Sequence, residues 1–165
     1  MCGARVRRAR EEEAPALLLL LSGTAEILRA TPGDHFPGYY SSVARLAHEI
    51  GAPPSGDGWL GWWISEEAET VVGAGAGGVP RAGEGEVYCL FVRTEYRRRG
   101  HGSVLLAAIT DQQRERDAVR QWANVDNRDQ DACRFLSARG FALDSDATRA
   151  WRFIETVGGA RTVPG

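Results

Sequence analysis

The distribution of apolar and polar residues along the chain predicts strands that alternate with amphipathic helices. Residues 86–92, EVYCLFV, form an almost continuous apolar run with aromatic and β-branched side chains, which is typical of a buried strand. Residues 101–117 follow with apolar side chains at helical spacing, namely Val104, Leu105, Ala108 and Ile109. A strand at 118–125 and a helix at 128–140, which ends at Gly140, continue the alternation. This order indicates a mixed α/β sheet covered by helices.

The rest of the chain extends the same pattern on both sides of this central region. We predict a strand at 4–8, helices at 11–30 and 40–50, and two final strands within 141–156. The apolar segments WLGWWISEE and ETVVGAGAGGV, which Glu66–Glu69 divide, predict an antiparallel hairpin whose glycines indicate a weak strand or a bulge. Because no linker or internal repeat divides the chain, we expect one domain over residues 1–157 and a flexible tail over 158–165.

Composition and charge narrow the classes of function. The chain has 165 residues, of which 43% are apolar and 25% are charged, as in a globular protein. A net charge of −2 argues against general affinity for nucleic acid or for an anionic membrane surface, so any anion site has to be local. Cys2, Cys89 and Cys133 are widely spaced, which predicts free thiols in a reducing compartment and no metal site.

The N-terminal region has the superficial order of a signal peptide, with basic residues before a leucine run. However, Glu11–Glu13 stand directly before the run, and the run itself, Ala14–Leu21, is too short to cross a bilayer. Acidic residues and Pro15 suit the first turn of a helix instead. We therefore expect a cytoplasmic protein without a membrane partner.

The segment RRRGHG, residues 97–102, lies between a predicted strand and a predicted helix. A glycine-rich turn in this position directs backbone N–H groups outward at the positive end of the helix dipole, which favours an anion. Its three arginines could add bidentate contacts to phosphate. The alternative is an exposed basic turn, and the segment matches neither the Walker A loop nor the G-x-G-x-x-G pattern.

The pattern Arg97-x-x-Gly100-x-Gly102 after an apolar strand resembles the acyl-CoA loop of the GCN5-related N-acetyltransferases, Q/R-x-x-G-x-G/A. The resemblance continues outside the loop. VRRAREEEAPALLLLL is similar to the family's first strand and helix, and GEVYCLFVRTEYRRRGHGSVLL to its fourth strand, loop and third helix. ANVDNRDQDACRFLSARGF is similar to the fifth strand and fourth helix. The resemblance implies a single α/β domain with a mostly antiparallel twisted sheet, helices on both faces, and splayed fourth and fifth strands.

The resemblance also implies that acetyl-CoA is the cosubstrate and that its pantetheine arm lies between the splayed strands. Backbone groups of Leu90 and Val92 would pair with that arm, and the Leu90 amide would polarise the thioester carbonyl as a catalytic contact. Amides from Arg98 to Ser103 would hold the pyrophosphate. The expected cofactor-binding residues are Leu90, Phe91, Val92, Arg97, Arg98, Arg99, Gly100, His101, Gly102, Ser103, Asn127, Asp129 and Leu136.

Two positions depart from the family's pattern. Asp129 stands where many members carry an asparagine that contacts the pantetheine arm, and Asn127 is close enough in sequence to substitute. Leu136 replaces a tyrosine that protonates the departing thiolate, which leaves Ser137 or Cys133 as alternative acids. Because thiol pKa values lie at about 8.5, the CoA thiolate leaves tolerably well near neutral pH, and loss of the acid need not abolish turnover.

A base is needed because an ammonium group must lose a proton before it attacks. Glu86 is the first candidate and Glu84 the second, and the alternative is that both are solvated hairpin residues. Aromatic residues with scattered acids would suit a cationic, partly apolar amine, although the same rings equally fit core or dimer contacts. These candidate acceptor residues are His35, Phe36, Tyr39, Tyr40, Trp59, Trp62, Trp63, Glu66, Glu67 and Glu69.

These features together lead us to expect an acetyl-CoA-dependent N-acetyltransferase that acts on a primary amine of a small molecule by direct transfer. One alternative is an acyl-CoA-binding module without turnover, which Asp129 and Leu136 favour. Another is an acetyltransferase for a protein N-terminus or side chain. Contact with nucleic acid through Arg97–Arg99 is disfavoured by the acidic total charge. A homodimer is possible by analogy with the family.

Overall fold

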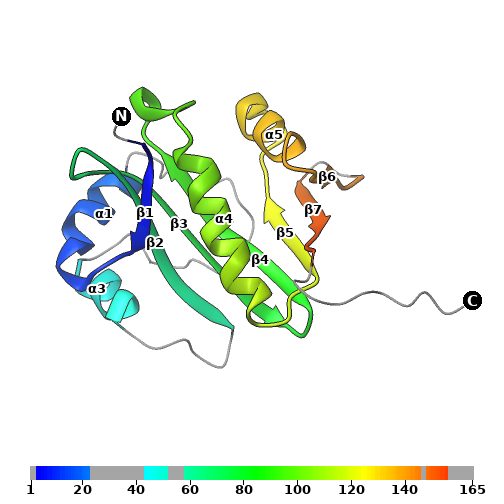
Figure 1. Cartoon of the computed structure of the whole chain (residues 1–165), viewed down its shortest axis with the longest axis horizontal. Helices are drawn as coiled ribbons and strands as arrows, with labels where there is room; N and C mark the ends of the chain where they lie inside the picture. The colour runs from blue at the N-terminus through cyan, green and yellow to red at the C-terminus, as the bar shows by residue number, and fades with distance from the viewer. Residues whose placement is uncertain (1–2, 23–42, 52–57, 146–147, 156–165) are drawn as a thin grey trace, which may run out of the picture.

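The computed structural model describes residues 3–22, 43–51, 58–145 and 148–155 (Figure 1). Several sequence-based expectations fall outside these residues. They are the end of the predicted helix 11–30, the start of the predicted helix 40–50, the flexible tail at 158–165, and the aromatic residues His35, Phe36, Tyr39 and Tyr40.

The described elements follow the predicted order. They are β1 (Arg5–Arg8), the 3-10 helix η1 (Glu11–Glu13), α1 (Ala14–Ser22), α3 (Val43–Gly51), β2 (Trp59–Glu67), β3 (Thr70–Arg81), β4 (Glu84–Val92), the 3-10 helix η2 (Thr94–Tyr96), α4 (His101–Arg114), β5 (Arg120–Asn124), α5 (Gln130–Ser137), β6 (Ala142–Leu143) and β7 (Arg149–Phe153). The strands form one seven-stranded sheet in the order β1-β2-β3-β4-β5-β7-β6. Every neighbouring pair is antiparallel except β4 and β5, which are parallel. The expected mixed, mostly antiparallel α/β fold is confirmed.

Helices cover both faces of the sheet, and the alternation of side chains along the strands explains why. On one face, Trp62 and Ile64 of β2 and Ala74 of β3 pack in a core cluster with Leu17 of α1 and Leu46 of α3. The opposite face receives α4, which packs along β2, β3 and β4 (Figure 1). The sheet therefore separates two apolar cores.

The glycines of β3 allow α4 to approach the sheet closely. Gly73, Gly75 and Gly77 alternate along the strand, and a Cβ atom at Gly77 would lie 2.6 Å from Cγ2 of Ile109 in α4. β3 contains the expected bulge, because Gly78 lies opposite Glu86 but Arg81 lies opposite Glu84, which leaves one extra residue in β3. The strand is not weak, however, since it is twelve residues long and includes all three of these glycines. Their spacing instead reflects the contact with the helix, because a larger side chain would push α4 away from the sheet.

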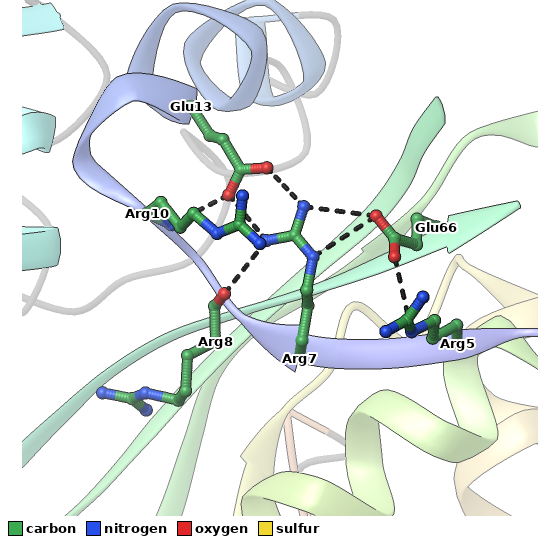
Figure 2. Close-up of polar contacts among 6 residues, drawn as sticks. All are labelled: Arg5, Arg7, Arg8, Arg10, Glu13 and Glu66. Atoms are coloured by element: carbon green, nitrogen blue, oxygen red, sulfur yellow. Dashed lines mark hydrogen bonds and ion pairs between the residues drawn. The ribbon is translucent and has the colours of Figure 1, made fainter. Parts of the chain in front are cut away.

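An ion-pair network joins the first strand to the start of α1 (Figure 2). The Arg7 guanidinium lies between the carboxylates of Glu13 and Glu66, with Nη2 at 2.5 Å from Oε1 of Glu13 and 3.2 Å from Oε2 of Glu66. The hydrogen bond to Glu13 raises the pKa of Arg7, and the same bond lowers the pKa of Glu13. The acidic residues expected in the first turn of the helix thus form η1, and α1 begins at Ala14.

A β-bulge in β4 coincides with the point where β4 and β5 separate. Along the β3–β4 pair, Ala76 lies opposite Cys89 but Gly77 lies opposite Val87, so Tyr88 is an extra residue in β4. The parallel β4–β5 pairing ends at Val87 and Ala123, whereas β4 continues to Val92. Among the described residues, the part of β4 beyond the bulge therefore pairs with β3 alone. We call the region beside this unpaired edge of β4 the β4–β5 gap.

Candidate active site

The backbone of β4 presents groups without a β5 partner to the β4–β5 gap. The amide of Arg93 donates to the carbonyl of Val72 at 2.9 Å, which shows that Arg93 directs its backbone toward β3. Since backbone direction alternates along a strand, Phe91 also faces β3, and Leu90 and Val92 face the gap. A Cβ atom at Gly73 would lie 2.9 Å from the carbonyl oxygen of Phe91, which agrees with this alternation.

Leu90 and Val92 differ in what their gap-facing groups contact. The Val92 carbonyl accepts a hydrogen bond from Nε of Arg97 at 3.1 Å. The Leu90 backbone faces the gap at a point that β5 does not reach, because the pairing of the two strands has already ended. Phe91, by contrast, packs its side chain against the core cluster under α1 and α3. Any cofactor contact of Phe91 would therefore lie on the other face of the sheet from α4.

The loop between η2 and α4 has the backbone geometry of an anion site. Arg98 and Gly100 both adopt left-handed conformations, with φ of 61° and 90°. The first backbone hydrogen bond of α4 runs from the Val104 amide to the Gly100 carbonyl, at 3.0 Å. The amides of residues 101–103 therefore have no acceptor within the helix, and they lie at the positive end of its dipole. A negatively charged group would be stabilised at this end of α4.

The three loop arginines have different partners. Arg97 bonds to the end of β4, as described above, and Nη1 of Arg99 lies 2.8 Å from Oε1 of Glu67. The guanidinium of Arg99 also lies 5.2 Å from the ring centre of Tyr96. Arg98 makes no side-chain hydrogen bond or ion pair within the described part of the chain. Arg97 and Arg99 thus hold the loop to the sheet, and Arg98 is the arginine that is left free to contact a ligand.

His101 is buried beneath the loop. Its side chain has no exposed surface, and Nε2 lies 3.0 Å from Oε2 of Glu67. The hydrogen bonds with His101 and then with Arg99 keep the pKa of Glu67 below its usual range. The side chain of His101 supports the loop from below, so only its backbone amide is directed at the anion site.

The acidic residues that the sequence suggested for an acceptor pocket lie elsewhere. Glu66 pairs with Arg5 and Arg7 at the edge of the sheet. Glu67 bonds to Arg99 in the loop at residues 97–102, which we call the anion loop. Glu69 is exposed in the β2–β3 turn, with φ of 64°. The grouping of these three acids around a cationic amine was therefore wrong. They are neighbours in sequence, but the strand and its turn direct them to different surroundings.

The tryptophans of β2 point to both faces of the sheet. Trp62 is buried in the core under α1, whereas Nε1 of Trp63 donates to Gln112 of α4 at 3.0 Å. Trp59 stacks on Tyr88, the extra residue of the bulge, with ring centres 5.8 Å apart and an angle of 19°. Trp59 is therefore the tryptophan of this segment that lies beside the bulge in β4.

Helix α5 packs against the first turn of α4. A Cβ atom at Gly102 would lie 3.0 Å from the ring of Phe135, and Nη2 of Arg139 donates to the hydroxyl of Ser103. Asp129 caps α5, because its Oδ1 accepts from the Ala132 amide at 3.0 Å. Asn127 is exposed on the loop before the helix.

Leu136 contributes to the core beneath α4. Its side chain is 7% exposed and packs in a cluster with Val87, Leu106 and Ala123. Val87 and Ala123 form the last β4–β5 pair, so this cluster lies at the closed end of the gap.

The two candidate bases lie on the face of β4 opposite α4. Gly85 between them abuts Gln113 of α4, so the flanking glutamates point away from that helix. Glu84 is bound on both oxygens, by Nε1 of Trp122 at 2.5 Å and by Arg120 at 3.5 Å. Within the described residues, the carboxylate of Glu86 has one side-chain contact, at 3.4 Å from Nη2 of Arg149. Of the two carboxylates, Glu86 is the one less committed to partners within the protein.

Sequence reasoning did not identify Arg149 as part of the site, and it assigned Glu67 to the acceptor pocket instead of to the loop that it contacts. Each contacts a candidate residue that is distant in the chain, and neither lies in a recognisable motif. The bulge at Tyr88 was also missed, since EVYCLFV contains no glycine that would indicate it.

A groove of about 570 Å³ lies apart from the gap, between β1, β2 and α4. Its lining residues are Val6, Arg8, Trp63, Val104, Ala107, Ala108, Asp111, Gln112 and Glu115. No residue of the loop at 97–102 takes part in it. Within the described part of the chain, no helix is both long enough and apolar enough to cross a membrane.

Solved structures with this fold cover nearly the whole chain. PaiA N-acetyltransferase from Thermoplasma acidophilum, in complex with coenzyme A, is 16% identical with a TM-score of 0.74, over 92% of this chain and 99% of that one. A GNAT-family acetyltransferase from Staphylococcus aureus is 13% identical with a TM-score of 0.71, over 93% and 100%. N-acetylglutamate synthase from Neisseria gonorrhoeae, complexed with coenzyme A and N-acetyl-glutamate, is 19% identical with a TM-score of 0.69, over 94% and 36%.

Because these structures are at most 19% identical to the chain, they establish only its fold. The family is established by a comparison of the sequence with family profiles. No curated protein matches the chain. The sequence profile of the Acetyltransferase (GNAT) family matches residues 24–141, which is more than half of the chain and includes the whole of the anion loop. The structure is consistent with this family match, because it has the parallel β4–β5 pair, the gap beyond that pair, and the loop at the start of α4. This chain therefore belongs to the GNAT family of acetyltransferases.

Proposed function

We propose that the protein transfers an acetyl group from acetyl-CoA directly to a primary amine in a ternary complex. The observation that carries this proposal is the β4–β5 gap, where Leu90 pairs with Gly75 of β3 but has no partner in β5. The gap leads to the anion loop before α4. An extended arm with amide groups can pair with such an edge as an added strand does. The bound coenzyme A in the PaiA structure supports the same ligand here.

The chain's own residues fit this cosubstrate. The amides of residues 98–103 and the left-handed turns at Arg98 and Gly100 would hold the pyrophosphate, and Arg98 would add a side-chain contact. Leu90 and Val92 would pair with the pantetheine arm, and the Leu90 amide would donate to the thioester carbonyl oxygen as negative charge develops on it.

Glu86 would act as the base. It would accept a proton from the ammonium group, directly or through water, so that the neutral nitrogen can attack the carbonyl carbon. A C–N bond then forms, the C–S bond breaks, and the sulfur leaves with the electron pair and takes up a proton. One further proton is released from the new amide nitrogen. Leu136 can supply no proton, so the sulfur would leave as a thiolate and take its proton from solvent.

We further propose that the acceptor is a small molecule and that the protein works in the cytoplasm. Aromatic rings beside the bulge, such as Trp59 stacked on Tyr88, support an enclosed acceptor site over an open peptide groove. The free thiols of Cys89 and Cys133 support a reducing compartment.

A second candidate is an acyl-CoA-binding module without turnover. The observation that favours it is the side chain of Leu136, which is packed in the core at the closed end of the gap and cannot itself donate a proton. This candidate requires tight binding of acetyl-CoA without release of free CoA when amines are added.

The two candidates are separated by mass spectrometry of the purified protein with acetyl-CoA and a broad pool of primary amines. Transfer predicts amine-dependent release of CoA together with an acetylated product of matching mass. Glu86→Gln should then lower kcat by about 10²- to 10⁴-fold with acetyl-CoA affinity retained, as expected for a lost general base. Glu84→Gln is the matched comparison and should have a much smaller effect. Bound acetyl-CoA that stays intact with every amine would favour the binding module.

A further inference from the structure

The face of the sheet away from α4 carries an arginine directly beside the candidate base. Gln121 of β5 donates to Thr110 and Gln113 of α4, so the next residue, Trp122, points to the opposite face. Glu86 points to that face as well, as shown above. Arg149 of β7 extends over the Trp122 ring, with its guanidinium 4.6 Å from the ring centre, and reaches Glu86.

The contact between Arg149 and Glu86 is loose for an ion pair. Nη2 and Oε1 are 3.4 Å apart, whereas charge-assisted N–H···O bonds are usually about 2.7–2.9 Å long. Nε of Arg149 is buried and has no hydrogen-bond partner within the described residues. The side chain of Arg149 is 41% exposed, and that of Glu86 is 13% exposed. Arg149 therefore keeps hydrogen-bonding capacity that the protein itself does not use.

The position of Arg149 is nevertheless well defined. Its guanidinium rests on Trp122, and its backbone amide donates to Oδ1 of Asp144 at 3.2 Å. The Asp144 amide in turn donates to the Arg149 carbonyl at 2.8 Å, which ties this end of β7 to the loop after β6. A cation held in this way is preorganised for an anionic group of a ligand.

Both charges lie at the closed end of the β4–β5 gap. Glu86 is opposite Trp122, one pair before the pairing of the strands ends at Val87 and Ala123, and Arg149 is opposite Asn124 at the end of β5. An amine that approaches the gap from the face opposite α4 would meet a carboxylate and a guanidinium next to each other.

We infer that the acceptor is an amine with a carboxylate on the adjacent carbon, as in an α-amino acid, and that Arg149 binds this carboxylate while Glu86 receives the ammonium proton. The inference rests on the proposed transfer function. A zwitterion offers one charge of each sign, so it can replace the loose internal pair with two charge-assisted contacts and leave neither side chain unpaired. An acceptor with only a positive charge would compete with Arg149 for Glu86 and leave the guanidinium without an anion.

The test compares acceptors that differ only in this carboxylate. The purified full chain is given acetyl-CoA with each common L-α-amino acid, with the corresponding α-amide, and with the decarboxylated amine. Release of CoA and the mass of the product are followed for each. With the preferred side chain, the free acid should exceed its amide in kcat/KM by about 10- to 100-fold, the usual effect of a charge-assisted hydrogen bond.

Variants of Arg149 then assign the discrimination to this residue. Arg149→Gln should raise KM for the free acid, remove the preference over the amide, and leave acetyl-CoA affinity unchanged, whereas Arg149→Lys should keep part of the preference. The control is Arg5→Gln, an exposed arginine that also pairs with a glutamate, Glu66, but on the first strand. Arg5→Gln should leave kcat/KM unchanged for both the free acid and the amide.

The possible failures are distinguishable. Wild-type protein that acetylates amides or simple amines as well as free acids would overturn this inference and leave the transfer function standing. An unchanged preference in Arg149→Gln would likewise overturn the role of Arg149. No release of CoA with any acceptor, despite binding of acetyl-CoA, would overturn the proposed transfer function and this inference with it.

Discussion

Oε2 of Glu67 lies 3.0 Å from Nε2 of His101, so the last residue of β2 is joined to the first residue of α4. The other carboxylate oxygen bonds to Arg99. One side chain thereby holds the anion loop on both sides of Gly100. The β2–β3 turn that follows contains Ala68 and Glu69 with φ of 48° and 64°, conformations that are unfavourable for residues other than glycine.

Glu67→Gln should weaken the binding of acetyl-CoA several-fold, because the neutral amide holds Arg99 and His101 less firmly and the loop loses its preorganisation. Isothermal titration calorimetry with acetyl-CoA measures this change in affinity. S-acetylpantetheine, which lacks the pyrophosphate, should bind equally well to wild type and variant. The matched control is Glu69→Gln in the same turn. An equal loss for both ligands would indicate general damage to the fold and contradict a role specific to the loop.

The two glycines of the loop should respond differently to substitution. Gly100 has φ of 90° with open space around its Cα, so Gly100→Ala carries only the backbone penalty of about 1–2 kcal/mol. At Gly102 a side chain would meet the ring of Phe135 at 3.0 Å, so Gly102→Val should displace α5 as well.

Measurements of acetyl-CoA affinity and of the melting temperature distinguish backbone strain at Gly100 from displacement of α5 at Gly102. Adding Phe135→Leu should partly rescue Gly102→Val, because the smaller side chain vacates the space, and should give Gly100→Ala no benefit. Rescue of Gly100→Ala by the same change would contradict the assignment of its defect to backbone strain. Near-normal affinity in Gly100→Val and Gly102→Val would contradict the assignment of the loop itself.

The network around Arg7 predicts an acid-dependent part of the stability. The hydrogen bond from Arg7 lowers the pKa of Glu13 in the folded state from its ordinary value of 4.5. A lowered folded pKa means that the contribution is complete above the unfolded value and disappears as the pH falls through the folded one. Glu13→Gln should therefore lower the free energy of unfolding by about 1 kcal/mol at pH 7, a value limited by partial exposure of the pair.

Urea unfolding measured between pH 7 and pH 3 tests this expectation. The difference in the free energy of unfolding between wild type and Glu13→Gln should shrink as the pH falls below 4.5, the ordinary pKa of a glutamate. Glu12→Gln, an exposed neighbour in the same 3-10 helix, should show little difference at any pH. A difference for Glu13→Gln that is independent of pH would contradict the electrostatic origin.

Leu136→Tyr places the family's usual phenol in this chain. Because Leu136 is 7% exposed within a packed cluster, the larger ring should destabilise the protein by about 1–3 kcal/mol. Leu136→Phe controls for size. If the hydroxyl reaches the departing sulfur, kcat should be higher in Leu136→Tyr than in Leu136→Phe at equal stability. Equal rates would show that this position contributes no proton to the reaction.

Local signals in the sequence determined the order of the elements and the place of the anion loop. The apolar run EVYCLFV, the helical spacing of Leu105 and Ile109, and the glycines at 100 and 102 each act over a few residues, so periodicity and turn chemistry predict them. The ends of elements were less well predicted. The helix expected to reach Asp117 ends at Arg114, and Asp117 adopts a left-handed conformation with φ of 61°.

The tertiary structure decided which side chains meet around these elements. Glu67 and His101 are 34 residues apart, and Glu86 and Arg149 are 63 apart. Such contacts depend on the register of the sheet, which a single extra residue at Tyr88 shifts for everything beyond it. The same bulge marks where β4 leaves β5 and the gap begins. The chemistry of the loop can be predicted from the sequence alone, whereas the pairing of Glu86 with Arg149 arises only when β4, β5 and β7 lie side by side.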